Sequence, residues 1–315
     1  MRVLMNPGYW KVKSAVNLRI KGVIVPLLTP FDRHGALDNG ATAGLVHFLI
    51  ERGIHGLLPG GTTGEGPLLV AEERRALAET VVRAANGQVP VIIHSGAITT
   101  GEAIELTRHA QSCGAAGAAL ITPFYYRFSD QALFSHFVQI CAAVPDFPIY
   151  LYNNPAVTGN HISAELVARL VEACPNIVGM KDSGGRLENL LRCMSLRDGA
   201  FNTASGNDGD ILAALALGMD ACVSGNANFV PELVVALADA ASSGDLERAR
   251  HLQQQLNAVR DVLEDGRDLS LFKGVLARRG LPVGDVRAPM LQAPESMIAS
   301  CWQAMTALDL QLVPV

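Results

Sequence analysis

The chain has 315 residues and a net charge of −5 at neutral pH; 49% of its residues are hydrophobic and 17% are charged. This composition excludes a disordered or fibrous protein, and the chain is long enough to bury a full core without disulfides. Aromatic residues make up only 5%, whereas there are 30 glycines, so the core must be aliphatic with many tight turns. The acidic balance, without a basic cluster, argues against nucleic acid as a partner.

Cysteine usage and hydropathy indicate the compartment. The six cysteines are scattered, without a C-x-x-C pair, and most lie in apolar contexts typical of a reducing environment. No continuous apolar run resembles a secretory signal, and no stretch approaches ~18 uncharged apolar residues. We therefore expect a cytoplasmic protein that binds no membrane.

From residue 22 onward, short apolar runs of strand length alternate with longer stretches that repeat every 3.6 residues. Strands are predicted at residues 22–28, 56–58, 89–94, 118–121, 149–152, 177–180, 201–204 and 221–223. Helices are predicted between them, for example at residues 71–85, 101–112, 131–143, 163–173 and 210–217. This strict alternation favours the α/β class and a closed (β/α)8 TIM barrel over an open doubly wound sheet, which no G-x-G-x-x-G motif supports.

After the last predicted strand the alternation stops. Helices are then predicted at residues 231–241, 246–264, 270–279 and 294–308. We therefore divide the chain into an N-terminal arm (1–20), a barrel (21–241) and a C-terminal helical region (242–315).

Several charged or titratable residues fall within helical patterns, and we give them no functional role. His47 and His136 are interpreted as structural. On the helix at 71–85, acidic and basic residues alternate, which is typical of a solvated outer face. These residues are Glu72, Glu73, Arg74, Arg75, Glu79 and Arg83.

Lys181 is the most unusual residue at a predicted strand end. In a βα barrel the reacting groups lie at the carboxyl ends of strands and in the loops that follow. Lys181 directly follows the apolar run 177–180, and the chain has only five lysines among its 25 Lys and Arg residues. Burial disfavours an ammonium and lowers its pKa, which produces an amine nucleophile. The alternative is a lysine whose head pairs with Asp182 or another nearby carboxylate.

A glycine- and threonine-rich turn follows the second predicted strand and contains Gly61, Thr62 and Thr63. Consecutive backbone N–H groups near a helix start can bind a carboxylate or phosphate, although such a loop can also simply turn the chain. Tyr125 and Tyr152 follow or end other strands. Each can be a proton relay or an amphipathic wall residue.

Two alternatives to an enzyme with a lysine nucleophile remain open. A metal-dependent aldolase would use His94, Glu65 and Asp182 around a divalent ion, but neither H-x-H nor H-x3-H spacing occurs among His94, His109 and His161, so we expect no metal. A catalytically silent barrel would serve as a binding or regulatory protein. The presence of both a strand-end lysine and a strand-end tyrosine argues against it.

Together and in this order, the motifs resemble the dihydrodipicolinate synthase / N-acetylneuraminate lyase family of Schiff-base barrels. The segments that carry the resemblance are Gly61-Thr62-Thr63-Gly64-Glu65, Tyr152-Asn153-x-Pro155 with Thr158-Gly159, and Gly179-Met180-Lys181. The resemblance covers the chain from about residue 21 to the C-terminal helices. It implies a homotetramer, a dimer of dimers, with active sites near a tight dimer interface. It also implies no cofactor other than a covalent lysine imine.

The resemblance also implies roles for individual residues. Lys181 would form an imine with a small-molecule 2-oxo acid, and Tyr152 would shuttle protons. Thr62 would link Tyr152 to a second tyrosine from the neighbouring subunit, either Tyr125 or the adjacent Tyr126. The groups implied to bind substrate are Gly61, Thr62, Thr63, Asn154, Val157, Gly206, Asn207 and Val223.

One position departs from the family pattern. The synthase usually carries an arginine two residues after the proline, in Tyr-Asn-x-Pro-x-Arg-Thr-Gly, whereas this chain has Val157. That arginine would bind the distal carboxylate of aspartate semialdehyde through a bidentate pair, and a valine has no donor for it. The competing possibility is that Arg127 or Arg186 reaches the same place.

The sequence therefore predicts a class I aldolase or lyase acting on a 2-oxo acid, with pyruvate as product or donor. A 2-oxo-3-deoxy sugar acid is the expected substrate, because its hydroxyls suit the amide and hydroxyl groups after the strands. These groups belong to Asn154, Ser205, Asn207 and Asn226. The alternatives are dihydrodipicolinate synthase itself, with its second substrate held by another cation, and a dehydratase or deaminase that uses the same imine.

Overall fold

The computed structural model describes residues 18–266, 268–308 and 310, so most of the predicted N-terminal arm lies outside the described residues. All the predicted strands are present. Their bounds are β1 Gly22–Val25, β2 Gly56–Leu57, β3 Ile92–His94, β4 Gly117–Ile121, β5 Ile149–Asn153, β6 Ile177–Asp182, β7 Asn202–Ser205 and β8 Ala221–Val223.

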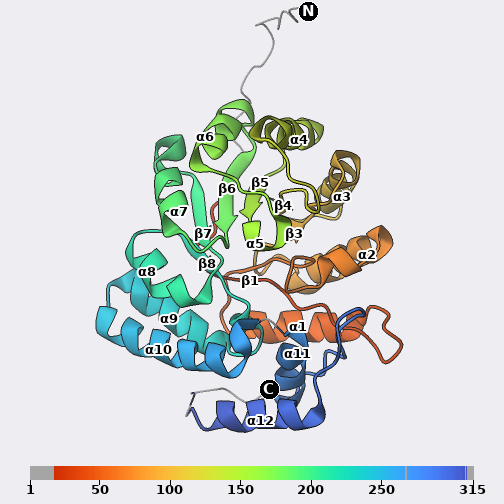
Figure 1. The fold of residues 1–315 in the computed structure, drawn as a ribbon, viewed down its shortest axis with the longest axis vertical. Helices are drawn as coiled ribbons and strands as arrows, with labels where there is room; N and C mark the ends of the chain where they lie inside the picture. Colours follow the sequence, from red (N-terminus) through yellow and green to blue (C-terminus); the bar gives the residue numbers. More distant parts are fainter. Residues whose placement is uncertain (1–17, 267, 309, 311–315) are drawn as a thin grey trace, which may run out of the picture.

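These strands form one parallel sheet in the order β2-β1-β8-β7-β6-β5-β4-β3. A parallel bridge between Leu57 and Val91 joins the two ends of the sheet. Helices surround the strands (Figure 1). The predicted TIM barrel is confirmed.

The bounds of β1, β3 and β6 differ most from the predicted ranges. β1 and β3 are shorter than expected because the predicted runs include Pro26 and Pro90, which have no N–H for the ladder. β6 is longer, so Lys181 and Asp182 lie within it rather than after it. Lys181 pairs in register with Tyr152 of β5, so the two candidate catalytic residues are strand neighbours.

The predicted helices are also present, within three residues at each end, and α1, α5 and α7 are added. The bounds are α1 Asn39–Glu51, α2 Ala71–Ala85, α3 Thr100–Ser112, α4 Asp130–Ala143, α5 Pro155–Thr158, α6 Ala164–Ala173, α7 Leu187–Cys193, α8 Ile211–Ala216, α9 Pro231–Ser243, α10 Leu246–Val262, α11 Leu269–Arg278 and α12 Glu295–Thr306. The last three helices gather beside the barrel, where α10 packs on α9 and α12 packs on α10 and α11 (Figure 1). The division of the chain at residues 20 and 241 stays a prediction.

The buried side chains form an inner and an outer layer because successive residues of a strand face opposite sides. On β5, Ile149 and Leu151 pack outward under the helices, whereas Tyr150 faces the barrel interior. The ring of Tyr150 leaves no room for a side chain at Gly179, whose added Cβ would lie 2.6 Å from it. The interior cluster is made of Ile20, Ile24, Leu58, Ile92, Ala119, Tyr150, Val178, Ala204, Ala221 and Val223.

The predicted solvated face of α2 is wrong at one position. Arg74 lies three and seven residues before the buried Leu77 and Val81, on the same helical stripe. Its guanidinium donates to the backbone carbonyls of His94 at 2.8 Å and Gly96 at 3.0 Å. Arg74 therefore caps the end of β3. The exposed side chains on this helix include those of Glu72, Glu79 and Arg83.

Candidate active site

Lys181 lies buried at the mouth of the barrel, with 7% of its surface exposed. Its Nζ atom lies 4.2 Å from the centroid of the Tyr152 ring. A Cβ atom added to Gly206 would lie 2.8 Å from Lys181 Cε and 2.1 Å from Ser183 Oγ, so only glycine leaves this space open. Among the described residues, no carboxylate forms an ion pair with Lys181. The amine is therefore held in place without a counterion.

Asp182, the expected alternative partner of Lys181, is bound elsewhere. Its Oδ1 atom accepts from Asn153 Nδ2 at 3.0 Å and from the Gly184 backbone at 2.7 Å. Its Oδ2 atom accepts from Asn189 Nδ2 at 2.7 Å. Both carboxylate oxygens thus tie the loop after β6 to its neighbours. Asp182 is structural, and the adjacent lysine is left free.

The Tyr152 hydroxyl lies at the centre of a hydrogen-bond network. It lies 3.3 Å from Thr62 Oγ1 and accepts from Asn154 Nδ2 at 3.1 Å. Burial acts to raise the pKa of this phenol, but the positive charge of Lys181 and hydrogen bonds with Thr62, Asn154 and Ser183 outweigh it and lower the pKa. A phenol of lowered pKa beside an amine is suited to moving a proton.

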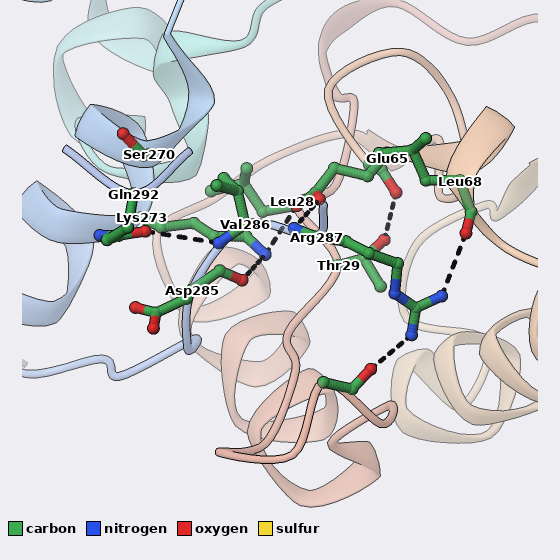
Figure 2. A network of polar contacts seen from close by, with 12 residues as sticks. Leu28, Thr29, Glu65, Leu68, Ser270, Lys273, Asp285, Val286, Arg287 and Gln292 are labelled. Carbon is green, nitrogen blue, oxygen red and sulfur yellow. Dashed lines mark hydrogen bonds and ion pairs between the residues drawn. The ribbon is translucent and has the colours of Figure 1, made fainter. Parts of the chain in front are cut away.

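The turn that carries Thr62 and Thr63 is anchored by Glu65, which has a left-handed backbone with φ of 55°. Its carboxylate lies 2.7 Å from Lys273 Nζ, and both side chains are fully buried. Its other oxygen accepts from the Arg287 backbone at 2.8 Å, as Figure 2 shows. Glu65 therefore fixes the turn to the C-terminal part of the chain.

The same network stacks two cations on one aromatic ring. Lys273 Nζ and the Arg287 guanidinium each lie 4.3 Å from the centroid of Phe31. Arg287 also binds both carboxylate oxygens of Glu73, at 2.6 and 2.8 Å. Its guanidinium donates to the Leu68 carbonyl as well (Figure 2). We call the group Phe31, Glu65, Glu73, Lys273 and Arg287 the turn anchor.

The three residues of the metal hypothesis have separate partners. Glu65 is bound by Lys273, Asp182 by backbone and amide groups, and His94 by Arg74. Within residues 18–266, 268–308 and 310, no group of three histidine, cysteine, aspartate or glutamate side chains is placed to hold a metal ion. The donor set of that hypothesis is therefore not assembled.

Two residues implied by the resemblance lie on the surface. Tyr125 is 84% exposed, has φ of 79°, and makes an edge-to-face contact with Tyr126 at 4.9 Å between centroids. Val157, on α5, is 55% exposed. One chain thus brings Thr62, Asn154 and Lys181 to Tyr152, but leaves Tyr125 facing outward.

The remaining predicted binding residues differ in their burial and in their hydrogen-bond partners. Asn207 donates to Asp210 at 2.7 Å and accepts from the Gly209 backbone, so its side chain caps a short helical turn. Val223 is buried within the interior cluster. Gly61 is buried and Thr63 half-buried on the anchored turn. The side chain of Asn207 is thus already engaged within the chain, and Val223 belongs to the barrel interior.

Two contributions escaped the sequence predictions. Ser183 follows β6 directly, and its hydrogen bond helps to lower the pKa of Tyr152. No motif or spacing in the sequence predicts this role. The alternation of charges predicts Arg74 on the outside of α2, whereas its spacing to Leu77 and Val81 puts it on the buried stripe. That spacing was the signal available.

The chain resembles known proteins over most of its length. Residues 19–308 match the model of the dihydrodipicolinate synthetase family. A 4-hydroxy-tetrahydrodipicolinate synthase of Brucella abortus is 35% identical over 272 residues, which cover 86% of this chain and 92% of that protein. An uncharacterised DapA-like lyase of Halobacterium salinarum is 37% identical over 273 residues, covering 87% and 89%.

Solved structures show the same likeness. The dihydrodipicolinate synthase of Aquifex aeolicus has a TM-score of 0.87 and 32% identity, covering 93% of this chain and 99% of that one. YagE, a prophage protein of the same family from E. coli K12 in complex with pyruvate, has a TM-score of 0.86 and 33% identity, covering 91% and 98%. None of the described helices has the length and apolar character needed to span a membrane.

Proposed function

This chain belongs to the dihydrodipicolinate synthetase family, and from that premise we propose that Lys181 forms a covalent imine with a 2-oxo acid. Enzymes of this family are lyases that use a covalent lysine–pyruvate imine and no metal cofactor. The observation that carries the assignment is the placement of Lys181. It is a buried amine without an ion-pair partner among the described residues, 4.2 Å from the ring of a tyrosine whose pKa is lowered.

The proposed imine forms by attack of Lys181 Nζ on the carbonyl carbon of the 2-oxo acid. One proton passes from the attacking amine to the carbonyl oxygen, which gives a carbinolamine, and Tyr152 delivers the second proton, so that the oxygen leaves as water and the iminium forms. The backbone and hydroxyl groups of Thr62 and Thr63 hold the substrate carboxylate, since the anchored turn that carries both brings Thr62 to Tyr152.

The same two residues, Tyr152 and Lys181, carry out the proposed carbon–carbon cleavage. The Tyr152 phenolate removes the proton from the C4 hydroxyl, the C3–C4 bond breaks, and its electron pair enters the iminium to give an enamine. An aldehyde leaves. Protonation of the enamine carbon and attack of water on the imine then release pyruvate and regenerate the Lys181 amine.

We propose that the substrate is a 2-oxo-3-deoxy sugar acid. Val157 supports this, because it is exposed at the position where the synthase pattern has arginine. A polyhydroxylated acid needs no cation there, and its hydroxyls can exchange water for protein amides at little net cost.

A specific contact favours the second candidate, dihydrodipicolinate synthase. Arg127 Nη1 donates to the Gly159 carbonyl at 2.9 Å, two residues beyond Val157. A guanidinium at that place could bind the carboxylate of aspartate semialdehyde instead of the missing arginine. A dehydratase or deaminase would share the imine and differ in the second step.

Borohydride reduction tests the imine. In the presence of pyruvate we expect one pyruvate-derived mass on Lys181 and none on Lys273, whose ammonium is paired with Glu65. Lys181→Ala should lose the label and most turnover. Labelling of another lysine, or no labelling by a panel of 2-oxo acids, would contradict the assignment.

A direct comparison tests the substrate. We expect pyruvate release from 2-oxo-3-deoxygluconate to exceed condensation of pyruvate with aspartate semialdehyde. Val157→Arg should improve condensation by roughly 30- to 5,000-fold, the worth of a charge-assisted pair of ~2–5 kcal/mol. Arg127→Gln is the matched variant: if wild type condenses the semialdehyde efficiently and Arg127→Gln does not, the synthase assignment replaces ours.

A further inference from the structure

His94 ends β3 and lies directly behind the candidate catalytic tyrosine. Its imidazole and the Tyr152 ring pack edge to face, with centroids 6.0 Å apart and planes at 85°. His94 is 6% exposed. Among the described residues its Nε2 atom has no hydrogen-bond partner. The proposed chemistry uses neither this histidine nor the arginine beside it.

Arg74 determines the state of that imidazole. Its Nη2 atom lies 3.3 Å from His94 Nδ1 and also donates to the His94 and Gly96 carbonyls. The two hydrogens of Nη2 are taken by these carbonyls, and a guanidinium only donates, so a proton on Nδ1 would point at another donor. The remaining proton of a neutral ring therefore lies on Nε2.

Burial and the neighbouring positive charges also favour the neutral form of the His94 ring. Burial lowers the pKa of His94 well below its ordinary value, and the positive charges of Arg74 on α2 and Lys181 on β6 lower it further. The Gly60 carbonyl acts weakly in the opposite direction. The Tyr152 phenol of β5 also packs on the ring.

We propose that Arg74 and His94 are positioning residues for Tyr152: Arg74 holds the imidazole neutral with its proton on Nε2, and this neutral ring fixes the tyrosine against Lys181. The inference rests on the proposed function in that Tyr152 is the group that moves the proton. A protonated His94 would place a second cation beside Tyr152 and Lys181. It would stabilise the phenolate and disfavour the ammonium, and so change how the pair shares its proton.

A spectroscopic experiment tests the state of the ring without relying on turnover. Solid-state NMR of the 15N-histidine-labelled full chain distinguishes the two ring nitrogens, and His94→Phe identifies the signal. At pH 6 we expect unprotonated Nδ1 and protonated Nε2. A doubly protonated ring, or a proton on Nδ1 alone, would overturn the proposal even if the imine chemistry holds.

Substitution of Arg74 tests its control of the ring. In Arg74→Met the pH of half-protonation of His94 should rise and the fixed tautomer should be lost. Arg74→Lys should restore both, because it keeps a donor-only cation. Arg75→Met, on the same helix, is the matched control and should leave the His94 signal unchanged. An unchanged signal in Arg74→Met would refute the proposed role of Arg74.

The pH profile tests the effect on Tyr152. Arg74→Met should lower kcat by about ten- to a hundred-fold through misplacement of the tyrosine, with a smaller change in KM, and add an acid limb to the profile. The double variant Arg74→Met/His94→Phe should lose that limb. If kcat of Arg74→Met falls by the same factor at every pH, with no new acid limb, Arg74 is only a packing residue.

Discussion

At the scale of single residues, two buried lysines show how neighbours decide reactivity. Lys181 and Lys273 lie at nearly equal distances over an aromatic ring, 4.2 Å from Tyr152 and 4.3 Å from Phe31. Lys273 is 2.7 Å from Glu65 and donates to the Asp285 carbonyl, so its ammonium is compensated. Lys181 has no such carboxylate among the residues described. The same side chain is structural in one place and free to react in the other.

The hydroxyl of Tyr152 gives a first prediction. Tyr152→Phe should fold normally and bind pyruvate, but slow imine formation and cleavage by about 10²–10⁴-fold, the usual value of a positioned acid–base group. Stopped-flow or rapid-quench trapping of the imine measures this. Thr62→Val should show a smaller defect of the same kind, and a wild-type kcat in Tyr152→Phe would show that the hydroxyl is only structural.

His136 gives a prediction on acid stability. It is buried on α4 with Nδ1 2.9 Å from Thr100 Oγ1, and burial lowers its pKa to about 4. Between pH 6.5 and 4 the unfolded state binds more protons than the folded state, so stability falls as pH falls, by up to about 1.4 kcal/mol per unit. Urea unfolding of wild type and His136→Gln should give a shallower pH dependence for the variant. Parallel curves would contradict this.

At the scale of elements, the turn after β2 is held by the turn anchor, whose members come from distant parts of the chain. Glu65 lies 222 positions before Arg287, with which it forms a hydrogen bond. The Thr29 hydroxyl adds a 2.5 Å bond to the Gly64 carbonyl. Thr62 and Thr63 therefore lie on an anchored loop, as the proposed binding of a carboxylate requires.

The buried ion pair in the turn anchor gives the element-scale prediction. Lys273→Met leaves the Glu65 carboxylate buried without its cation and should cost about 3–5 kcal/mol of unfolding free energy. The double variant Lys273→Met/Glu65→Gln removes both charges and should recover much of that loss. Denaturant unfolding measures both variants, and equal stability of the two would show that the pair contributes nothing.

At the scale of the whole molecule, we expect the family's homotetramer, in which each active site receives a tyrosine from its neighbour. Tyr125 and Tyr126 are 84% and 63% exposed in one chain, so a second chain can reach them. This assembly and the cytoplasmic location stay predictions.

Subunit mixing tests the shared site. Tyr125→Phe and Lys181→Ala should each be nearly inactive, and mixing their unfolded chains before refolding should restore part of the activity. Mixed assemblies contain sites with an intact lysine and an intact neighbouring tyrosine. Tyr126→Phe is the matched control; if it is the inactive variant and Tyr125→Phe is active, the relay role belongs to Tyr126.

The sequence pattern was enough to predict the barrel and to single out Lys181 as the candidate nucleophile. Short apolar runs and stretches with a 3.6-residue repeat are local properties, so they located the strands and helices that surround the site. Lys181 could be singled out because an apolar strand ending in lysine is costly unless it has a use. Val157 was visible as a departure from the family pattern.

Which buried charges are compensated could be seen only in the folded chain. That Glu65 meets Lys273, that Asp182 turns away from Lys181, and that Arg74 reaches His94 depend on side chains packed from separate elements. Periodicity gives the face of a helix but not its neighbour across the packing layer. Because burial makes each charge sensitive to its nearest partner, these contacts distinguish Lys273, which is paired with Glu65, from Lys181, the proposed nucleophile.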